Sequence, residues 1–246
     1  GKIIAIHLSY ASRADQRGRR PAAPSYFFKP ASSVAASGGT VERPTGTELL
    51  AFEGEIALII GRDTHRVGLA EAWDHVAAVT AANDLGVYDL RAADKGSNLR
   101  SKSRDGFTPL GPDLIDARSI DPERLRVRTW VNGTLVQDDT SAGMLFPLAQ
   151  IVADLSQHLT LETGDVILTG TPAGSSVIGP GDVVEVEVDA LDTGATSGRL
   201  VTTVAARSDG GFDPALGSLP AVDDVQREEA WGSLAAAGLP EAPASV

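Results

Sequence analysis

The alternation of apolar and polar residues predicts that strands dominate this chain. Residues 52–61, FEGEIALIIG, form an apolar run that stops at Gly61, and residues 183–188 place a valine at every second position from 184. A period of two is typical of a strand with one buried face. Further strands are predicted within residues 2–10 and 162–172, and turn residues flank the second of these.

Local signals predict one hairpin and two helices. In RLRVRTWVNGTLVQDD, residues 124–139, alternating strand residues flank Asn132-Gly133. An Asn-Gly pair in this setting is the strongest short signal for a two-residue hairpin turn. Apolar residues recur at helical spacing within residues 68–84 and 147–161, so we expect a helix in each segment.

Strands therefore outnumber helices, and the regular strand–helix alternation of a doubly wound fold is missing. We predict an α+β fold that is mostly β. A length of 246 residues favours one large domain, to which we assign residues 1–208. Residues 209–246 are rich in Ala, Gly and Pro and are expected to form a tail with one amphipathic helix at 223–237, capped by Asp224.

Composition narrows the class of protein. The chain has no cysteine, which excludes a disulfide framework, a thiolate metal site and a cysteine nucleophile. Its net charge of -12 disfavours nucleic-acid binding, which needs a basic surface. No apolar run reaches the ~18 residues of a membrane helix, so we expect no membrane association and a cytoplasmic protein. The basic block at residues 13–20 is by itself typical of a solvated loop.

Two glutamates at the head of the apolar run raise a chemical question. Side chains two residues apart in a strand share a face, so Glu53 and Glu55 point the same way. Two carboxylates on one face repel unless a cation, a shared proton or a divalent metal lies between them. Oxygen ligands suit Mg²⁺, Mn²⁺ or Ca²⁺. On periodicity alone, a solvated strand face is the simpler interpretation.

Four further segments, together with these glutamates, resemble the fumarylacetoacetate hydrolase family. The segments are AANDLGVYD at 81–89, NLRSKSRDGFTPLGP at 98–112, LTGTPAG at 168–174 and PGDVVEVEV at 180–188. The resemblance extends from Ile3 to Val204. It implies a mixed, mostly β roll with a few peripheral helices, and a homodimer.

By position, the resemblance implies that Glu53, Glu55 and Asp84 hold Mg²⁺ or Mn²⁺ and leave coordination sites for water and a chelating substrate. Lys102 matches a lysine that approaches the substrate and the metal-bound water. Thr171 matches a threonine that contacts the substrate. The alternatives are a surface role for Lys102 and a tight turn around Thr171.

The chain departs from the family pattern at the catalytic base. Family members carry a His and, three residues later, a Glu that activate water; here these positions hold Arg13 and Gln16. Neither side chain accepts a proton near neutral pH. Arg13 and Lys29 are instead candidates for binding substrate carboxylates. His7 is the candidate replacement base, although a lone histidine at a strand end is more often structural, as we expect for the other histidines.

A second departure follows the predicted metal ligand Asp84. Tyr88 stands where the family commonly has an arginine, and we place Tyr88 among the substrate-binding residues. Arg91, Arg100 and Arg104 are candidates for supplying the missing positive charge, and spacing does not decide among them.

These residues predict chemistry on a 2-oxo acid. A metal that binds the carboxylate and keto oxygen acts as an electron sink, which favours decarboxylation and isomerisation over hydrolysis when the water-activating pair is missing. The resemblance is closest to the isomerase/decarboxylase branch of homoprotocatechuate (4-hydroxyphenylacetate) breakdown, which implies a 2-oxo di- or tricarboxylate substrate. The alternatives are hydrolysis of an acylpyruvate, decarboxylation of oxaloacetate, and an inactive metal-binding paralogue.

Overall fold

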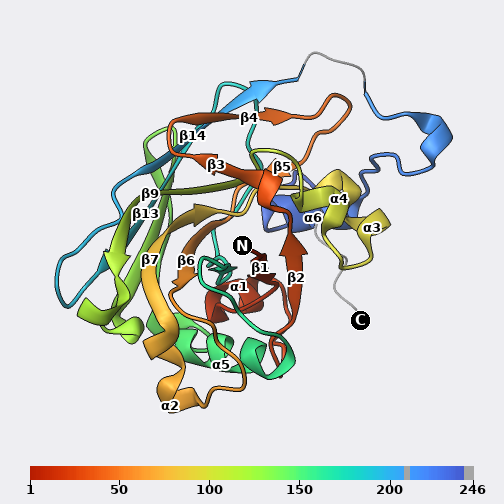
Figure 1. Ribbon diagram of the computed structural model, residues 1–246. Coiled ribbons are helices and arrows are strands. Elements are labelled where there is room, and N and C mark those ends of the chain that lie inside the picture. Colours follow the sequence, from red (N-terminus) through yellow and green to blue (C-terminus); the bar gives the residue numbers. More distant parts are fainter. Residues whose placement is uncertain (208–210, 241–246) are drawn as a thin grey trace, which may run out of the picture.

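The computed structural model describes residues 1–207 and 211–240, and its core lies between two sheets (Figure 1). The larger sheet has the order β2-β1-β12-β6-β7-β9-β3, and the smaller has the order β11-β10-β13-β14-β4. A third, two-stranded sheet pairs β5 with β8. The strands are β1 (Ile3–Ile6), β2 (Tyr26–Lys29), β3 (Val34–Ala36), β4 (Gly39–Arg43), β5 (Leu50–Ala51), β6 (Gly54–Ile60), β7 (Val76–Asn83), β8 (Gly86–Val87), β9 (Thr108–Asp116), β10 (Leu125–Val131), β11 (Thr134–Thr140), β12 (Val166–Leu168), β13 (Val183–Ala190) and β14 (Leu200–Ala206).

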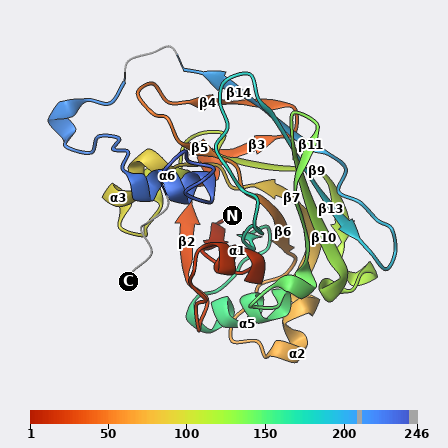
Figure 2. The same ribbon diagram turned by 180° about the vertical axis from the view of Figure 1, so that it is seen from behind.

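The helices are short and lie around the sheets. Figures 1 and 2 show α2 and α5 together at one end of the molecule, and α3 beside α6 at one side. The α-helices are α1 (Ala11–Gln16), α2 (Leu69–Ala72), α3 (Arg91–Asp94), α4 (Leu99–Lys102), α5 (Leu148–His158) and α6 (Asp224–Trp231). Single 3₁₀ turns occur at η1 (Ala31–Ser33), η2 (Trp73–His75), η3 (Tyr88–Leu90), η4 (Ala117–Ser119), η5 (Pro122–Arg124), η6 (Ser141–Gly143) and η7 (Pro214–Leu216).

Strand β6 is the predicted apolar run, and it is buried on both faces. Ile56, Leu58 and Ile60 pack into the core that includes the inward valines of β13. Ala57 and Ile59 face a second apolar cluster on the other side of the larger sheet. A strand covered on both faces has an almost continuous apolar sequence, which explains the run after its first residues.

The predicted hairpin is confirmed. Strands β10 and β11 pair as neighbours, and Asn132 and Gly133 between them have φ angles of 51° and 79°. A type I′ turn needs positive φ at both central positions, and Asn-Gly tolerates this best. The helix predicted at residues 147–161 is also present, as α5.

The prediction of one helix across residues 68–84 is wrong for its second half. Only Leu69–His75 is helical, and Val76–Asn83 is strand β7. This strand is rich in alanine and valine and lies between β6 and β9, where nearly every position is buried. Pairing with two neighbouring strands has therefore outweighed the helical spacing. The strand predicted within residues 2–10 is also shorter than expected, because β1 ends at Ile6.

The C-terminal helix is shorter than expected and has a different cap. Helix α6 ends at Trp231, and its N-cap is Asp223 rather than Asp224. Asp223 Oδ1 accepts from the amide of Gln226 at 2.8 Å, and Gln226 Oε1 accepts from the amide of Asp223 at 2.9 Å. Residues 209–210 and 241–246 of the expected tail lie outside the described residues. In the described ranges, no helix has the length and apolar character needed to cross a bilayer.

We expect Asp223→Ala to loosen α6. The substitution removes a reciprocal capping pair, which costs about 1 kcal/mol of local stability. Hydrogen exchange at the amides of residues 224–231 measures this loss. Asp224→Ala is the matched control, and a larger effect from this control would contradict the assignment of the cap.

Candidate metal centre

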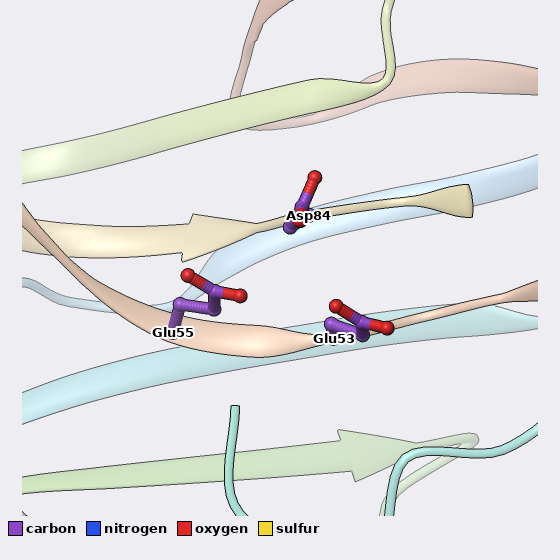
Figure 3. Close-up of side chains that lie close together, drawn as sticks. All are labelled: Glu53, Glu55 and Asp84. Atoms are coloured by element: carbon purple, nitrogen blue, oxygen red, sulfur yellow. The ribbon is translucent and has the colours of Figure 1, made fainter. Parts of the chain in front are cut away.

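Two antiparallel strands bring the three predicted metal ligands together. Glu53 precedes β6, Glu55 is its second residue, and Asp84 directly follows β7. Gly54 pairs with Asn83, and the amide of Asp84 donates to the carbonyl oxygen of Glu53 at 2.8 Å. The three carboxylates each place an oxygen within 4.8 Å of the others. In Figure 3, Glu53 and Glu55 rise from the same side of the ribbon toward Asp84.

The glycine between the glutamates allows the smaller sheet to approach. A Cβ at Gly54 would lie 1.9 Å from Thr129 Oγ1 of β10. The amide of Gly54 donates to Gln137 Oε1 of β11 at 3.1 Å. Because side chains alternate along a strand, the Glu-Gly-Glu pattern turns two carboxylates one way and leaves the other face open for close packing.

Two buried lysines neutralise part of this negative charge. Lys102 Nζ lies 2.5 Å from both Glu53 Oε2 and Asp84 Oδ2. Lys29 Nζ donates to Asp84 Oδ1, and to the carbonyl oxygen of Phe107 at 2.9 Å. The lysine side chains are 5% and 0% exposed, respectively. Buried charges are costly unless paired, so these contacts stabilise the cluster.

The lysines do not neutralise the three carboxylates equally. Burial raises the pKa of Glu53, but the charges of Lys102, Arg13 and Arg91 and the hydrogen bond from Lys102 together outweigh burial and bring this pKa to about 2. Burial and the charges of Asp84 and Glu53 raise the pKa of Glu55 well above its ordinary value. The amide of Gly170, 2.7 Å from Glu55 Oε2, offsets only part of this effect. Glu55 is therefore the carboxylate most in need of a cation.

This donor set fits a hard divalent cation. Mg²⁺ and Mn²⁺ prefer carboxylate oxygens at about 2.1 Å, which places ligand oxygens about 3 to 4 Å apart. The spread of 4.8 Å among the three carboxylates is compatible with that arrangement after small rotations of the side chains. An ion held there would also neutralise Glu55, the carboxylate whose charge the two lysines offset least.

Helix α4 fixes the position of Lys102. The carboxylate of Asp94 accepts from the amides of Arg100 and Ser101 at 3.0 and 2.8 Å, and so satisfies donors at the start of this helix. A Cβ at Gly86 would lie 3.1 Å from Lys102 Cγ, so the glycine makes room for the lysine stem. Lys102 is thus a buried, positioned residue, and the alternative of a surface lysine is wrong.

A cavity of about 230 Å³ opens beside the carboxylates, and its wall is basic. Glu53, Lys102 and Thr171 line it together with four arginines among the described residues, which are Arg13, Arg17, Arg19 and Arg91. The basic block at 13–20 therefore contributes to the pocket, and its interpretation as a solvated loop is wrong for Arg13, which is 3% exposed.

Arg13 and Gln16, at the two predicted dyad positions, contact each other on α1. Arg13 Nη1 donates to Gln16 Oε1 at 2.5 Å. Arg13 Nη2 lies 3.4 Å from the hydroxyl of Tyr88 and 3.5 Å from that of Ser175. The pair presents a guanidinium to the pocket and supplies no group that removes a proton from water near neutral pH.

Tyr88 connects this basic wall to the carboxylates. Its hydroxyl donates to Glu53 Oε1 at 3.1 Å and accepts from Arg17 Nη2 at 3.0 Å. The predicted position of Tyr88 in the pocket is therefore observed. A role in substrate binding stays a prediction.

Of the three arginines that spacing could not separate, one lines the pocket. Arg91 lines the pocket. Arg100 Nη1 lies 3.3 Å from Asp94 Oδ1, and the guanidinium of Arg104 lies 5.1 Å from the ring centroid of Phe212. Sequence spacing treated these three arginines alike because their separation in space depends on the turn between α3 and α4.

Thr171 lines the pocket, and its hydroxyl is held by neighbours. The hydroxyl donates to the carbonyl oxygen of Gly54 at 2.8 Å and accepts from Gln137 Nε2 at 2.8 Å. Gln137 is 2% exposed and also donates to the carbonyl oxygen of Pro172 at 2.9 Å. The sequence predicted Gln137 only as a strand residue, since nothing local marks a glutamine that links two sheets.

His7 and Lys29 have surroundings that differ from the expected ones. His7 lines the pocket, but Nδ1 lies 3.1 Å from Ser25 Oγ and Nε2 lies 3.0 Å from the carbonyl oxygen of Gly96. Nδ1 also lies 3.1 Å from the carbonyl oxygen of Ser25, so backbone or hydroxyl groups engage both ring nitrogens. This favours the structural role; a catalytic role stays a prediction. Lys29 is fully buried against Asp84 and lies outside the pocket lining, so its ammonium neutralises this carboxylate; a contact with a substrate carboxylate stays a prediction.

Comparison with known families identifies the chain. Residues 2–205 match the family described as fumarylacetoacetate (FAA) hydrolase, C-terminal. The chain belongs to the fumarylacetoacetate hydrolase family. The resemblance noted from sequence is therefore confirmed.

Relatives within this family include named enzymes. The 4-hydroxyphenylacetate degradation bifunctional isomerase/decarboxylase of Salmonella dublin is 37% identical over 206 residues, which are 83% of this chain and 47% of that protein. Oxaloacetate tautomerase YisK of Bacillus subtilis is 35% identical over 203 residues, 78% of this chain and 67% of that protein. The chain thus spans about half the length of the bifunctional relative. These similarities support an enzyme of the fumarylacetoacetate hydrolase family.

Solved structures of the family confirm the predicted fold class. The 5-carboxymethyl-2-hydroxymuconate delta-isomerase of Mycobacterium smegmatis is 32% identical, with a TM-score of 0.75 over 85% of this chain and 80% of that one. The 2-hydroxyhepta-2,4-diene-1,7-dioate isomerase of Mycobacterium marinum is 31% identical, with a TM-score of 0.73 over 85% of this chain and 75% of that one. The α+β, mostly β architecture is shared with these structures.

Without metal, we expect the stability of the protein to fall as the pH rises through the raised pKa of Glu55. The folded state holds this proton more tightly than the unfolded chain, so ionisation favours unfolding. Glu55→Gln should flatten the fall, and saturating Mg²⁺ or Mn²⁺ should oppose it. Denaturant unfolding from about pH 5 to about pH 9 measures both effects.

Glu71→Gln, on an exposed part of α2, is the control for the loss of one carboxylate. Parallel curves of stability against pH for the Glu55→Gln variant and the unsubstituted protein, both without metal, would contradict the assignment of the raised pKa to Glu55.

Proposed function

We propose that this chain is a divalent-metal-dependent decarboxylase and isomerase of 2-oxo di- or tricarboxylates. The observation that carries the proposal is the contact between Arg13 and Gln16 at the positions of the water-activating pair. A guanidinium in this place suits a substrate carboxylate, whereas hydrolysis needs a base. The acidic triad and the basic wall of the pocket support the same conclusion.

The acidic triad would hold Mg²⁺ or Mn²⁺, which supplies a Lewis acid for the carboxylate and keto oxygen of a 2-oxo acid. Lys102 pairs with two carboxylates of the triad, Glu53 and Asp84. Burial lowers the pKa of Lys102, but the charges of Asp84 and Glu53 outweigh burial and raise this pKa above its ordinary value. An ammonium in the pocket is suited to hold the negative charge that develops in a keto–enol shift, whereas its raised pKa makes it a poor proton donor.

The basic wall favours substrates with more than one carboxylate. Of the four pocket arginines only Arg13 is buried, at 3% exposed, and we assign it to one substrate carboxylate. The isomerase/decarboxylase relatives support a substrate of the 4-hydroxyphenylacetate pathway, such as an oxo-ene tricarboxylate or a hydroxy-diene dioate. The tautomerase relative supports oxaloacetate as a second candidate within the same chemistry.

A homodimer stays a prediction. Light scattering of the purified protein in solution measures its mass and tests this prediction.

A product assay tests the proposed function. The protein is incubated with Mn²⁺ or Mg²⁺ and, separately, with the pathway tricarboxylate, the hydroxy-diene dioate, oxaloacetate and fumarylpyruvate. Proton NMR and mass spectrometry identify the products. We expect metal-dependent loss of carbon dioxide or a double-bond or keto–enol shift, without cleavage of fumarylpyruvate. Lys102→Met should slow the reaction about 100-fold or more.

Cleavage of fumarylpyruvate would show that another base activates water, and His7 would be the first position to substitute. No turnover of any of the four acids with either metal would favour the inactive paralogue. In both cases the proposed function would be wrong.

We expect Arg13→Ala to raise the KM for the best substrate about tenfold or more, because a charge-assisted hydrogen bond contributes about 1.5 to 3 kcal/mol. Arg20→Ala is the matched control, since Arg20 belongs to the same basic block but is exposed and pairs with Asp15. Steady-state kinetics of both variants measure the difference. An unchanged KM for the Arg13→Ala variant would remove Arg13 from the substrate site.

A further inference from the structure

A helix that lies beyond the family match contributes a carboxylate to the pocket. Helix α6 follows residue 205, where the match ends, and its Glu229 lines the same cavity as Glu53 of the acidic triad. Glu229 Oε2 lies 3.3 Å from Arg91 Nη1 and 3.8 Å from Arg17 Nη1. Two guanidinium groups thus converge on a single carboxylate oxygen.

Several contacts hold α6 in this position. Ala230 is fully buried in a cluster with Leu49 and Tyr88. Arg227 Nη2 donates to Glu48 Oε2 at 3.0 Å. Figures 1 and 2 both show α6 beside α3, the helix that begins with Arg91. The placement of Glu229 therefore follows from the packing of the helix.

The end of α6 also reaches the arginine–glutamine pair. A Cβ at Gly232 would lie 2.5 Å from Gln16 Nε2. Gly232 has a φ angle of 87° and caps the helix, so its lack of a side chain serves both the cap and this close approach. The C-terminal segment is thus part of the pocket surroundings of this chain.

The two outer arginines lie close to the proposed metal ligands. Arg17 donates to the hydroxyl of Tyr88, and this hydroxyl donates to Glu53. The guanidinium of Arg91 lies 4.5 Å from the ring centroid of the same tyrosine. A short diacid with one end at the triad can therefore place its other end at Arg17 and Arg91.

Glu229 is a weak partner for these arginines. Strong charge-assisted N–H···O bonds measure about 2.7 to 2.9 Å, and both contacts of Glu229 are longer. The side chain of Glu229 is 41% exposed, whereas Arg17 and Arg91 are 15% and 28% exposed. A carboxylate that fits the guanidinium groups better can displace it.

We propose that Arg17 and Arg91 bind a second carboxylate of the substrate, and that Glu229 occupies this subsite until the substrate displaces it. The inference rests on the proposed function, because it places the 2-oxo acid end of the substrate at the triad. The subsite selects diacids over monoacids of the same length. Glu229 lowers the affinity for these diacids, since each of them must first replace an internal carboxylate.

The test compares matched pairs of stable 2-oxo acids by calorimetry, with the full chain and saturating Mg²⁺. The pairs are 2-oxoglutarate with 2-oxovalerate, and 2-oxoadipate with 2-oxohexanoate, which differ in the distal carboxylate. The unsubstituted protein should bind at least one diacid about tenfold tighter than its monoacid. Arg91→Met should remove this preference, so that a diacid and its matched monoacid bind with similar affinity.

Glu229→Gln should tighten diacid binding about two- to fivefold, the range expected for loss of an exposed ion pair, without changing monoacid binding. Glu228→Gln is the matched control, because Glu228 is the exposed neighbour on the same helix. Thermal melting checks that each variant is folded, and Arg17→Met replaces Arg91→Met if the latter is unfolded.

The outcomes separate this inference from the proposed function. If no 2-oxo acid binds in the presence of Mg²⁺, the proposed function is wrong. If both acids of each pair bind equally, or if Arg91→Met and Arg17→Met keep the preference, the distal subsite is wrong. If Glu229→Gln weakens diacid binding, Glu229 orients the arginines and is not their displaceable occupant.

Discussion

Repulsion among three buried carboxylates is the constraint on which the rest of this structure depends. Each of Glu53, Glu55 and Asp84 has a carboxylate oxygen within 4.8 Å of the others, where two unit charges repel by about 3.5 kcal/mol at an effective dielectric constant of 20. Lys29 of β2 and Lys102 of α4 reduce this repulsion by pairing with Asp84. The fold thus brings together segments that are far apart in sequence, and the negative charge of the triad is neutralised only by several of them jointly.

The sheets hold this charged cluster rigidly because close packing surrounds it. Gly54 separates the two glutamates and admits Thr129 and Gln137 of the smaller sheet. Gln137 in turn holds Thr171 at the pocket wall. The buried apolar side chains of β6 lie directly beyond the glutamates. The site therefore stands on a strand that is packed on both faces, which favours a preorganised set of oxygen ligands.

The pocket has acidic side chains at its floor and basic side chains along its wall. The triad suits a divalent cation, and the arginines suit the carboxylates of a substrate. Replacing the water-activating pair by Arg13 and Gln16 shifts the wall further toward anion binding. Glu229 of α6 adds one negative charge at the outer end of the pocket. The chemistry of this chain is thus set as much by its departures from the family pattern as by the shared ligands.

The sequence by itself determined the hairpin at Asn132 and the apolar strand behind Glu55, because adjacent residues and strand periodicity fix those features locally. The acidic triad was predicted only through the family resemblance, since periodicity by itself places Glu53 and Glu55 on one face and says nothing of Asp84. Only the tertiary structure decided that residues 76–83 form a strand, since pairing on both edges outweighs helical spacing. It also decided that Arg91 faces the pocket while Lys29 lies buried. Those positions depend on contacts between segments distant in the chain, and no local pattern encodes such contacts.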